Sequence, residues 1–339
     1  MVFFGVFLKT LGFLSAIFVF LIGINILFFF SNESKKSEFE MINGDKNSKN
    51  IIASMNLNGP IFNSNNNNLL SKNFNNYINP QNVKSILEGL KKINVKVLLV
   101  KINSPGGTVS ASVELENIFN NFKKETNTKI YFFTNEILAS GGYWVATSAD
   151  KIFASYGSII GSIGVSGPSW FYYDTPMNLS SGIFGQSIET KKGIEIYNQT
   201  AGQGKDLFNP YRRPETKEID HLQNIVDGIY DDFILKVSNS RKIDISFVKN
   251  NIGALIYSSI QAKQNFLVDE VIDYETLIKS IIKENNFNDY KIYELKNETS
   301  FIGSFIAKLN TNNDYSYNLI CRKIDTTINM VIPLFFKEC

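Results

Sequence analysis

The sequence predicts an α/β protein with a parallel sheet and crossover helices, preceded by one transmembrane helix. Three observations lead to this fold class. Residues 10–30 form a run of 21 uncharged residues near the N-terminus. Two apolar runs of strand length follow, VKVLLVKI at 95–102 and KIYFFT at 129–134. Each run ends in a glycine-containing turn and leads into a helix-like pattern, and strand–helix–strand order favours a parallel sheet with right-handed crossovers.

The composition is that of a globular chain. Hydrophobic residues make up 44% and charged residues 19% of the 339 residues, and the net charge is +2. The lysines are scattered, so no nucleic-acid partner is expected. There is one histidine, His221, and the two cysteines are Cys321 and Cys339. A site with several histidine ligands and a Cys-rich zinc site are therefore excluded, and no metal or cofactor is expected.

The N-terminal run is long enough to cross a bilayer, since about 1.5 Å per residue must span roughly 30 Å of hydrocarbon. It exceeds a usual signal-peptide core and no A-x-A-like cleavage signal follows, so we expect an uncleaved anchor over residues 1–30. Lysines lie on both sides of it and leave its orientation open. Residues 31–50 are polar and without periodicity, which predicts a tether.

The remaining elements follow from hydrophobic periodicity and turn signals. We expect a main domain over 51–285, and a C-terminal extension over 286–339 that ends in a short apolar segment at 328–336. The first half of the domain should contain a strand at 54–61, an Asn-rich loop at 63–79, a helix from Pro80, the strand at 95–102, a helix with Leu115 and Phe119 on its core face, and the strand at 129–134. The second half should contain short strands within 152–165, a helix within 214–241, a helix–strand pair over 258–269 and a helix at 276–283.

Two turns fall at carboxyl ends of predicted strands, 103–107 (NSPGG) and 139–142 (ASGG), where sites form in parallel sheets. Ser140 opens a predicted helix, beside free backbone N–H groups and the positive end of the helix dipole, so we predict that it is a nucleophile. Taken alone, the stretch also fits a packing turn. A Ser-His-Asp triad would need His221, which falls off the apolar stripe of its helix and is interpreted as a surface residue.

Three ordered motifs carry a family resemblance. NSPGG (103–107), ASGGYW (139–144) and GSIGV (161–165) resemble the signal peptide peptidase A family, membrane-anchored serine proteases related to protease IV. TAGQGKD (200–206) followed by NPYR (209–212) resembles the lysine segment of that family. The resemblance covers about 51–282 and the anchor. It implies a crotonase/ClpP-like fold and a serine endopeptidase with a Ser–Lys dyad.

The resemblance assigns roles to five residues. Ser140 matches the nucleophile, Lys205 the general base, and Ser162 a serine whose hydroxyl orients the lysine ammonium. The backbone N–H groups of Gly107 and Gly141 match the oxyanion hole. A lysine accepts a proton only in its neutral form, which burial in a dry pocket favours.

Simpler explanations stay open for each role. Lys205 also fits a surface lysine, and Ser162 and the glycines also fit a tightly packed turn. Lys191 and Lys192 lie nearer to Ser140 in sequence and compete for the role of base, but Lys205 keeps the G-x-x-K-D context. The 65-residue separation of Ser140 and Lys205 indicates an insertion, and NFLVD at 265–269 departs from the usual Gly-Leu-Val-Asp.

The resemblance also implies a setting. We expect a single-pass protein of the inner membrane, with its catalytic domain on the periplasmic or outer side, that degrades cleaved signal peptides or other extended apolar peptides. With one copy of ASGGYW it resembles the single-repeat type, which implies a homo-oligomeric ring, expected to be an octamer. The alternatives are a crotonase-type acyl-CoA enzyme, against which the anchor counts, and a catalytically silent oligomeric membrane scaffold, against which intact Ser140, Lys205 and Ser162 count.

Overall fold

The computed structural model describes residues 2–31, 39–63, 77–170, 172, 178–182, 185–189, 200–202, 204–210, 212–295 and 329–331. The chain divides into two compact units, Met1–Glu38 and Phe39–Cys339. Cys321, Cys339, Lys191 and Lys192 lie outside the described residues, so the pairing of the cysteines stays untested.

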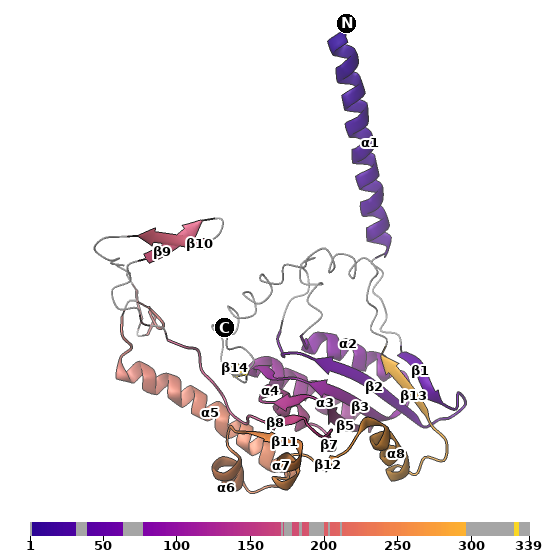
Figure 1. Ribbon diagram of the computed structural model, residues 1–339, viewed down its shortest axis with the longest axis vertical. Helices are drawn as coiled ribbons and strands as arrows, with labels where there is room; N and C mark the ends of the chain where they lie inside the picture. The colour runs from indigo at the N-terminus through magenta and orange to yellow at the C-terminus, as the bar shows by residue number, and fades with distance from the viewer. Residues whose placement is uncertain are drawn as a thin grey trace. The chain divides into compact units, whose positions relative to one another are not determined.

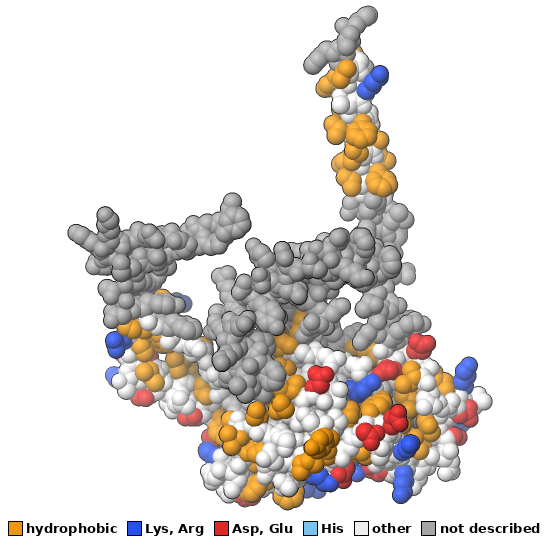
Figure 2. Space-filling model, viewed as in Figure 1, with side chains coloured by type: hydrophobic (Ala, Val, Ile, Leu, Met, Phe, Trp, Pro, Cys, Tyr) orange, Lys and Arg blue, Asp and Glu red, His pale blue; other side chains and the backbone are white. Residues whose placement is uncertain are grey.

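The described part of the first unit is one long helix, α1 (Val2–Ser31). Its segment Phe4–Gly23 has a mean hydropathy of 2.2 and is long and apolar enough to cross a membrane. None of that segment is buried against protein, and Figure 2 shows hydrophobic side chains over most of its visible surface. A helix that is apolar all round is typical of a membrane span. The helix contains the whole of the predicted anchor run.

The second unit is built on a seven-stranded sheet with the order β1-β13-β2-β3-β5-β7-β12 (Figure 1). Every neighbouring pair is parallel except β1 and β13. The α/β class with a parallel sheet is therefore confirmed. The strands are β1 (Phe39–Gly44), β2 (Ile51–Asn58), β3 (Val95–Asn103), β5 (Lys129–Thr134), β7 (Lys151–Ala154), β12 (Glu270–Val271) and β13 (Lys291–Leu295).

Helices cover both faces of this sheet, as expected for parallel strands with apolar side chains on both sides. One face packs against α2 (Pro80–Leu90), α3 (Val109–Thr126) and α4 (Gly141–Ala146), with part of α5 (Thr216–Arg241). The other face packs against α8 (Tyr274–Glu284) through Leu277 and Ile281. The shorter helices are α6 (Ile245–Phe247), the π-helix η2 (Val248–Ile252) and α7 (Ser259–Gln264).

A second, smaller sheet lies at the carboxyl side of the large one. It has the order β11-β8-β6, formed by β6 (Ile137–Ala139), β8 (Ile159–Gly161) and β11 (Ile256–Ser258). Strands β6 and β8 are parallel, and β11 is antiparallel to β8. Strands β9 (Asn178–Gly182) and β10 (Gly185–Glu189) form an antiparallel pair, and β4 (Gly106–Thr108) pairs with β14 (Asn329–Val331).

Strands β1 and β13 of the large sheet lie in segments where the sequence predicted no strand. The predicted tether contains β1, and the predicted C-terminal extension contributes β13, which lies between β1 and β2. Strand β1, FEMING, is mostly exposed, and Glu40 interrupts its few apolar residues, so it carries no continuous apolar run. Both strands depend on partners far away in the chain, which local periodicity cannot reveal.

One buried side chain of the large sheet makes stability depend on pH. Tyr131 of β5 is 1% exposed and donates a hydrogen bond to Glu284 Oε1 at 3.1 Å. Burial raises the pKa of Tyr131 to about 12. In the unfolded chain the phenol ionises near pH 10, so the unfolded state loses this proton first as the pH rises.

We therefore expect Tyr131 to lower stability only above about pH 10, by up to ~1.4 kcal/mol per pH unit until about pH 12. Urea unfolding near pH 9 and pH 11 should show a smaller alkaline loss for Tyr131→Phe than for the wild type. Tyr156→Phe is the control, because Tyr156 is 85% exposed, and should behave as the wild type. Equal alkaline losses in wild type and Tyr131→Phe would contradict the prediction.

Candidate active site

Ser140 lies at a sharp turn between β6 and α4 and is 1% exposed. Its backbone has φ 53° and ψ −124°, in the left-handed half of the φ range that a serine rarely adopts. The serine N–H donates to the Gly161 carbonyl at 2.8 Å, and its carbonyl accepts the Trp144 N–H at 2.9 Å. Residues held in such conformations cluster at active sites. Within the described part of the chain, Ser140 Oγ makes no hydrogen bond.

Ser162 lies beside Ser140. Strands β6 and β8 pair in parallel with Ala139 opposite Gly161, so the two serines follow the last pair of the ladder. Ser162 also has a positive φ, 52°, and its N–H donates to the Leu255 carbonyl at 2.7 Å. The ends of two neighbouring strands thus hold both serines in constrained backbone conformations.

Gly107 and Gly141 lie close together and tolerate no side chain. A Cβ on Gly107 would lie 2.0 Å from the Ile61 carbonyl oxygen. A Cβ on Gly141 would lie 2.4 Å from Ser112 Oγ and 3.2 Å from the Gly107 nitrogen. The two glycine-containing turns therefore meet, and a bridge between Ser104 and Leu138 joins them further back.

Among the described residues, Lys205 makes no hydrogen bond to this cluster. It is exposed, and its N–H donates to the Gly202 carbonyl at 3.2 Å. Among the residues that the structure describes, Lys205 Nζ makes no hydrogen bond or ion pair. The single chain therefore brings Ser140 together with Ser162, Gly107 and Gly141, but forms no hydrogen bond between Lys205 and Ser140.

Arg212 holds the turn that carries Lys205. Its Nε donates to Asp206 Oδ2 at 2.6 Å, and its Nη2 donates to Glu218 Oε1 at 2.6 Å. The guanidinium also lies over the Trp170 ring, 5.1 Å from the centroid. Hydrogen bonds from Arg212 lower the pKa of both carboxyls. The lysine turn is thus fixed to the start of α5 without using the Lys205 side chain.

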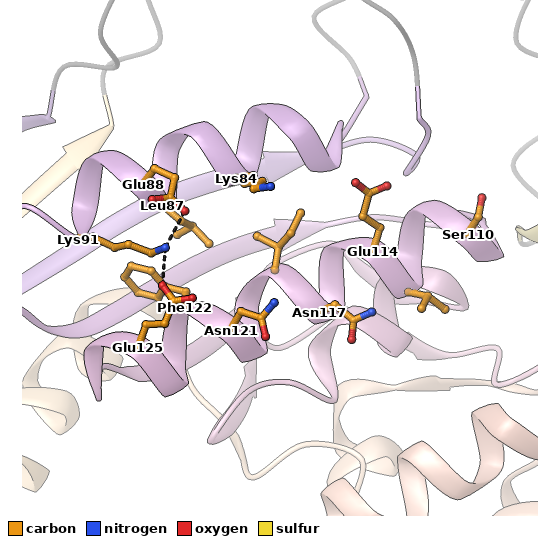
Figure 3. A pocket seen from close by; sticks show the side chains of 12 residues that line it. Lys84, Leu87, Glu88, Lys91, Ser110, Glu114, Asn117, Asn121, Phe122 and Glu125 are labelled. Carbon is orange, nitrogen blue, oxygen red and sulfur yellow. Dashed lines mark hydrogen bonds and ion pairs between the residues drawn. The ribbon is translucent and has the colours of Figure 1, made fainter.

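Two surface cavities lie elsewhere. One of about 680 Å³ lies between α2 and α3, where Lys91 pairs with Glu88 and Glu125 (Figure 3). The other, of about 520 Å³, is polar and lies at the carboxyl ends of β2 and β3, beside Asn58 and Asn103. Neither cavity is lined by the five residues predicted for catalysis.

Comparison with known proteins identifies the family. Residues 122–288 match the sequence pattern of peptidase family S49. A protein of Enterococcus faecium that is named as a signal peptide peptidase, SppA, is 32% identical over 297 residues, which is 85% of this chain and 79% of that protein. The chain belongs to peptidase family S49. The family predicted from the ordered motifs is confirmed, and the family supports a serine-type protease.

Other similar proteins cover smaller parts of this S49 chain. Protease 4 of Haemophilus influenzae is 28% identical over 178 residues, which is 52% of this chain and 26% of that protein. Among solved structures, a ClpP1 variant from Listeria monocytogenes aligns with 65% of this chain and 91% of its own, at 13% identity and a TM-score of 0.39.

Sequence reasoning missed one buried group that contacts α4, the helix that follows Ser140, in this S49 chain. Glu116 of α3 is 3% exposed and accepts the Trp144 indole N–H at 2.8 Å and the Lys236 ammonium at 2.7 Å. The available signal was an acidic residue next to the apolar positions Leu115 and Phe119. His221, in contrast, is exposed on α5, as predicted.

Proposed function

We propose that this S49 chain is a membrane-anchored serine endopeptidase with Ser140 as its nucleophile. The observation that carries the proposal is the constrained, positive-φ backbone of Ser140, next to the paired glycines Gly107 and Gly141. A nucleophile at a strained turn has its hydroxyl placed before substrate arrives, which reduces the reorganisation needed for attack. The family supports serine-type chemistry.

In the proposed mechanism Lys205 is the general base. Neutral Lys205 takes the proton of the Ser140 hydroxyl as Oγ attacks the scissile carbonyl, and Ser162 orients the resulting ammonium. The N–H groups of Gly107 and Gly141 bind the oxyanion, each contributing about 3 kcal/mol to transition-state stabilisation. The ammonium then protonates the leaving amine, and water releases the acyl group from Ser140.

The mechanism requires Lys205 to leave its exposed position and to lie beside a serine hydroxyl. Assembly of several copies into a homo-oligomeric ring would supply this burial, and the family resemblance implies such a ring. Because Arg212, Asp206 and Glu218 hold the lysine turn, the turn can be presented as a formed unit. The ammonium itself makes no competing ion pair among the described residues.

We further propose that the substrates are extended apolar peptides, such as cleaved signal peptides left in the membrane. The edge of β4 supports this proposal, because it pairs with an extended segment of the chain itself. Strand β14 runs antiparallel to β4 and places Met330 opposite Gly107. An extended substrate paired at this edge would be held by backbone hydrogen bonds next to the proposed oxyanion hole. The apolar helix α1 would keep the enzyme where such peptides accumulate.

A serine-directed fluorophosphonate probe tests the proposed function. We expect it to label the full-length, detergent-solubilised wild type, with the modification mapped to Ser140 by peptide mass spectrometry. Unlabelled wild type, or a modification mapped to another serine, would overturn the proposal. Unlabelled wild type would favour an acyl-CoA enzyme or a silent scaffold of the same fold.

A further inference from the structure

The Glu116 carboxylate connects three helices. Oε2 accepts the Trp144 Nε1–H of α4 at 2.8 Å, and the Lys236 ammonium of α5 donates to Oε1 at 2.7 Å and to Oε2 at 2.9 Å. Asn120 Nδ2, one turn further along α3, donates to Oε1 at 3.2 Å. This buried carboxylate therefore accepts four hydrogen bonds, one of them from the helix that follows Ser140.

Trp144 connects Glu116 to Ser140, the proposed nucleophile. Its backbone N–H donates to the Ser140 carbonyl at 2.9 Å, so two hydrogen bonds through one residue join Glu116 to Ser140. The indole ring also packs against Phe233 of α5, with ring centroids 4.8 Å apart. The direction of the indole is therefore fixed at its edge by Glu116 and on its face by Phe233.

Helix α4 needs such an anchor because it has only six residues. A helix this short is not stable by itself, and tertiary contacts must set its orientation. The turn at its start is also strained, since Ser140 has φ 53° and ψ −124°. Such conformations persist only where the surrounding structure holds them.

We propose that Glu116 is a positioning residue, which fixes Ser140 in its reactive conformation through the Trp144 indole. The inference rests on the proposed function, because it takes Ser140 as the nucleophile. The same carboxylate binds Lys236 of α5, the helix that begins just after the Lys205 turn. Glu116 thus joins the helix that follows the proposed nucleophile to the helix that follows the proposed base.

The chemistry of the site requires a carboxylate. An ionised carboxylate only accepts hydrogen bonds, so it satisfies the indole N–H and the ammonium together. A glutamine keeps one acceptor oxygen, and the Lys236 side chain is 41% exposed and can turn to solvent, whereas Trp144 is 3% exposed and cannot. The glutamine oxygen would therefore keep the indole hydrogen bond, so the informative change is Glu116→Leu, which leaves the indole N–H without this acceptor. The loss in Glu116→Leu should fall on the indole and on the turn that it supports.

The test measures how fast Ser140 reacts. Full-length Glu116→Leu in detergent is titrated with the fluorophosphonate probe, which separates the maximal labelling rate from the half-saturating probe concentration. We expect the maximal rate to fall by about 10-fold to 100-fold, because a displacement near 1 Å has that effect on a positioned reaction. The half-saturating concentration should stay within about two-fold, since Glu116 does not touch the probe.

Two further variants separate positioning from general stability. Glu125→Leu is the matched control, because Glu125 lies on the same helix and pairs with Lys91 of α2, and it should label as the wild type. Trp144→Phe keeps an aromatic ring but removes the indole N–H, and it should slow labelling as Glu116→Leu does. The double variant should be no slower than the slower single variant, because both changes remove the same hydrogen bond.

Three results would overturn the inference while leaving the proposed function intact. They are wild-type labelling by Glu116→Leu, losses in the two single variants that multiply in the double variant, and equal losses in Glu125→Leu. Failure of the proposed function is recognised separately, because the wild type would then carry no label on Ser140. A thermal melt of each variant shows whether the protein is folded at the assay temperature.

Discussion

Replacing Ser140 with alanine should lower kcat for peptide cleavage by about 10⁴-fold or more, because no other group replaces a nucleophile. The substitution removes a single oxygen, and Ser140 Oγ makes no hydrogen bond within the described residues, so the fold should be preserved. The assay uses the full-length protein in detergent with a quenched fluorescent apolar peptide.

Ser148→Ala is the matched control for this result. Ser148 is also buried, closely follows α4, and donates to the Val145 carbonyl at 2.7 Å. Its replacement should leave kcat within a few-fold of the wild type, because Ser148 lies in none of the turns assigned to catalysis. Cleavage by Ser140→Ala at a tenth of the wild-type rate or more would exclude Ser140 as the nucleophile.

Replacing Lys205 with methionine should lower kcat by a similar factor, on the order of 10³ to 10⁴, because the proton of the nucleophile then has no acceptor. Methionine keeps the length and apolar stem of lysine but removes the amine. The turn itself should stay folded, since Arg212 holds it through Asp206 and Glu218. The same cleavage assay measures kcat, and labelling of Ser140 by the probe should slow in parallel.

The two competing lysines supply the controls. Lys191→Met and Lys192→Met should each retain cleavage close to the wild type. Loss of activity in one of these variants, with Lys205→Met unaffected, would move the general base to that position. Ser140 would keep its role in that case.

The central strands could be predicted because their apolar runs are continuous. The strand predicted at 129–134 coincides with β5, and that predicted at 95–102 lies within β3. Both are buried on two faces by helices, so the pattern needs no knowledge of the partner strand. Strands β1 and β13 were missed because neither has such a run, and β1 depends on pairing with β13 at the sheet edge and on the packing of Phe39 against the core.

Some residues of the candidate site could be predicted from the sequence and others could not. Ser140, Gly107 and Gly141 lie in turns that directly follow strands, so the order of strands and motifs was enough to predict that they meet. Glu116 could not be found, because its burial depends on Trp144 and Lys236, which lie 28 and 120 residues further along the chain. Without those partners, Glu116 resembles any charged residue of an amphipathic helix.

The two edges of the seven-stranded sheet have a consequence for the proposed handling of extended apolar peptides. At one edge, β1 is mostly exposed, carries Glu40 and Asn43, and has a register shift between Met41 and Asn43, and at the other β12 has only two residues. Irregular, charged or very short edges discourage a further strand from adding. Peptides with a high tendency to aggregate would therefore find no long, regular template on the large sheet on which fibrils could grow.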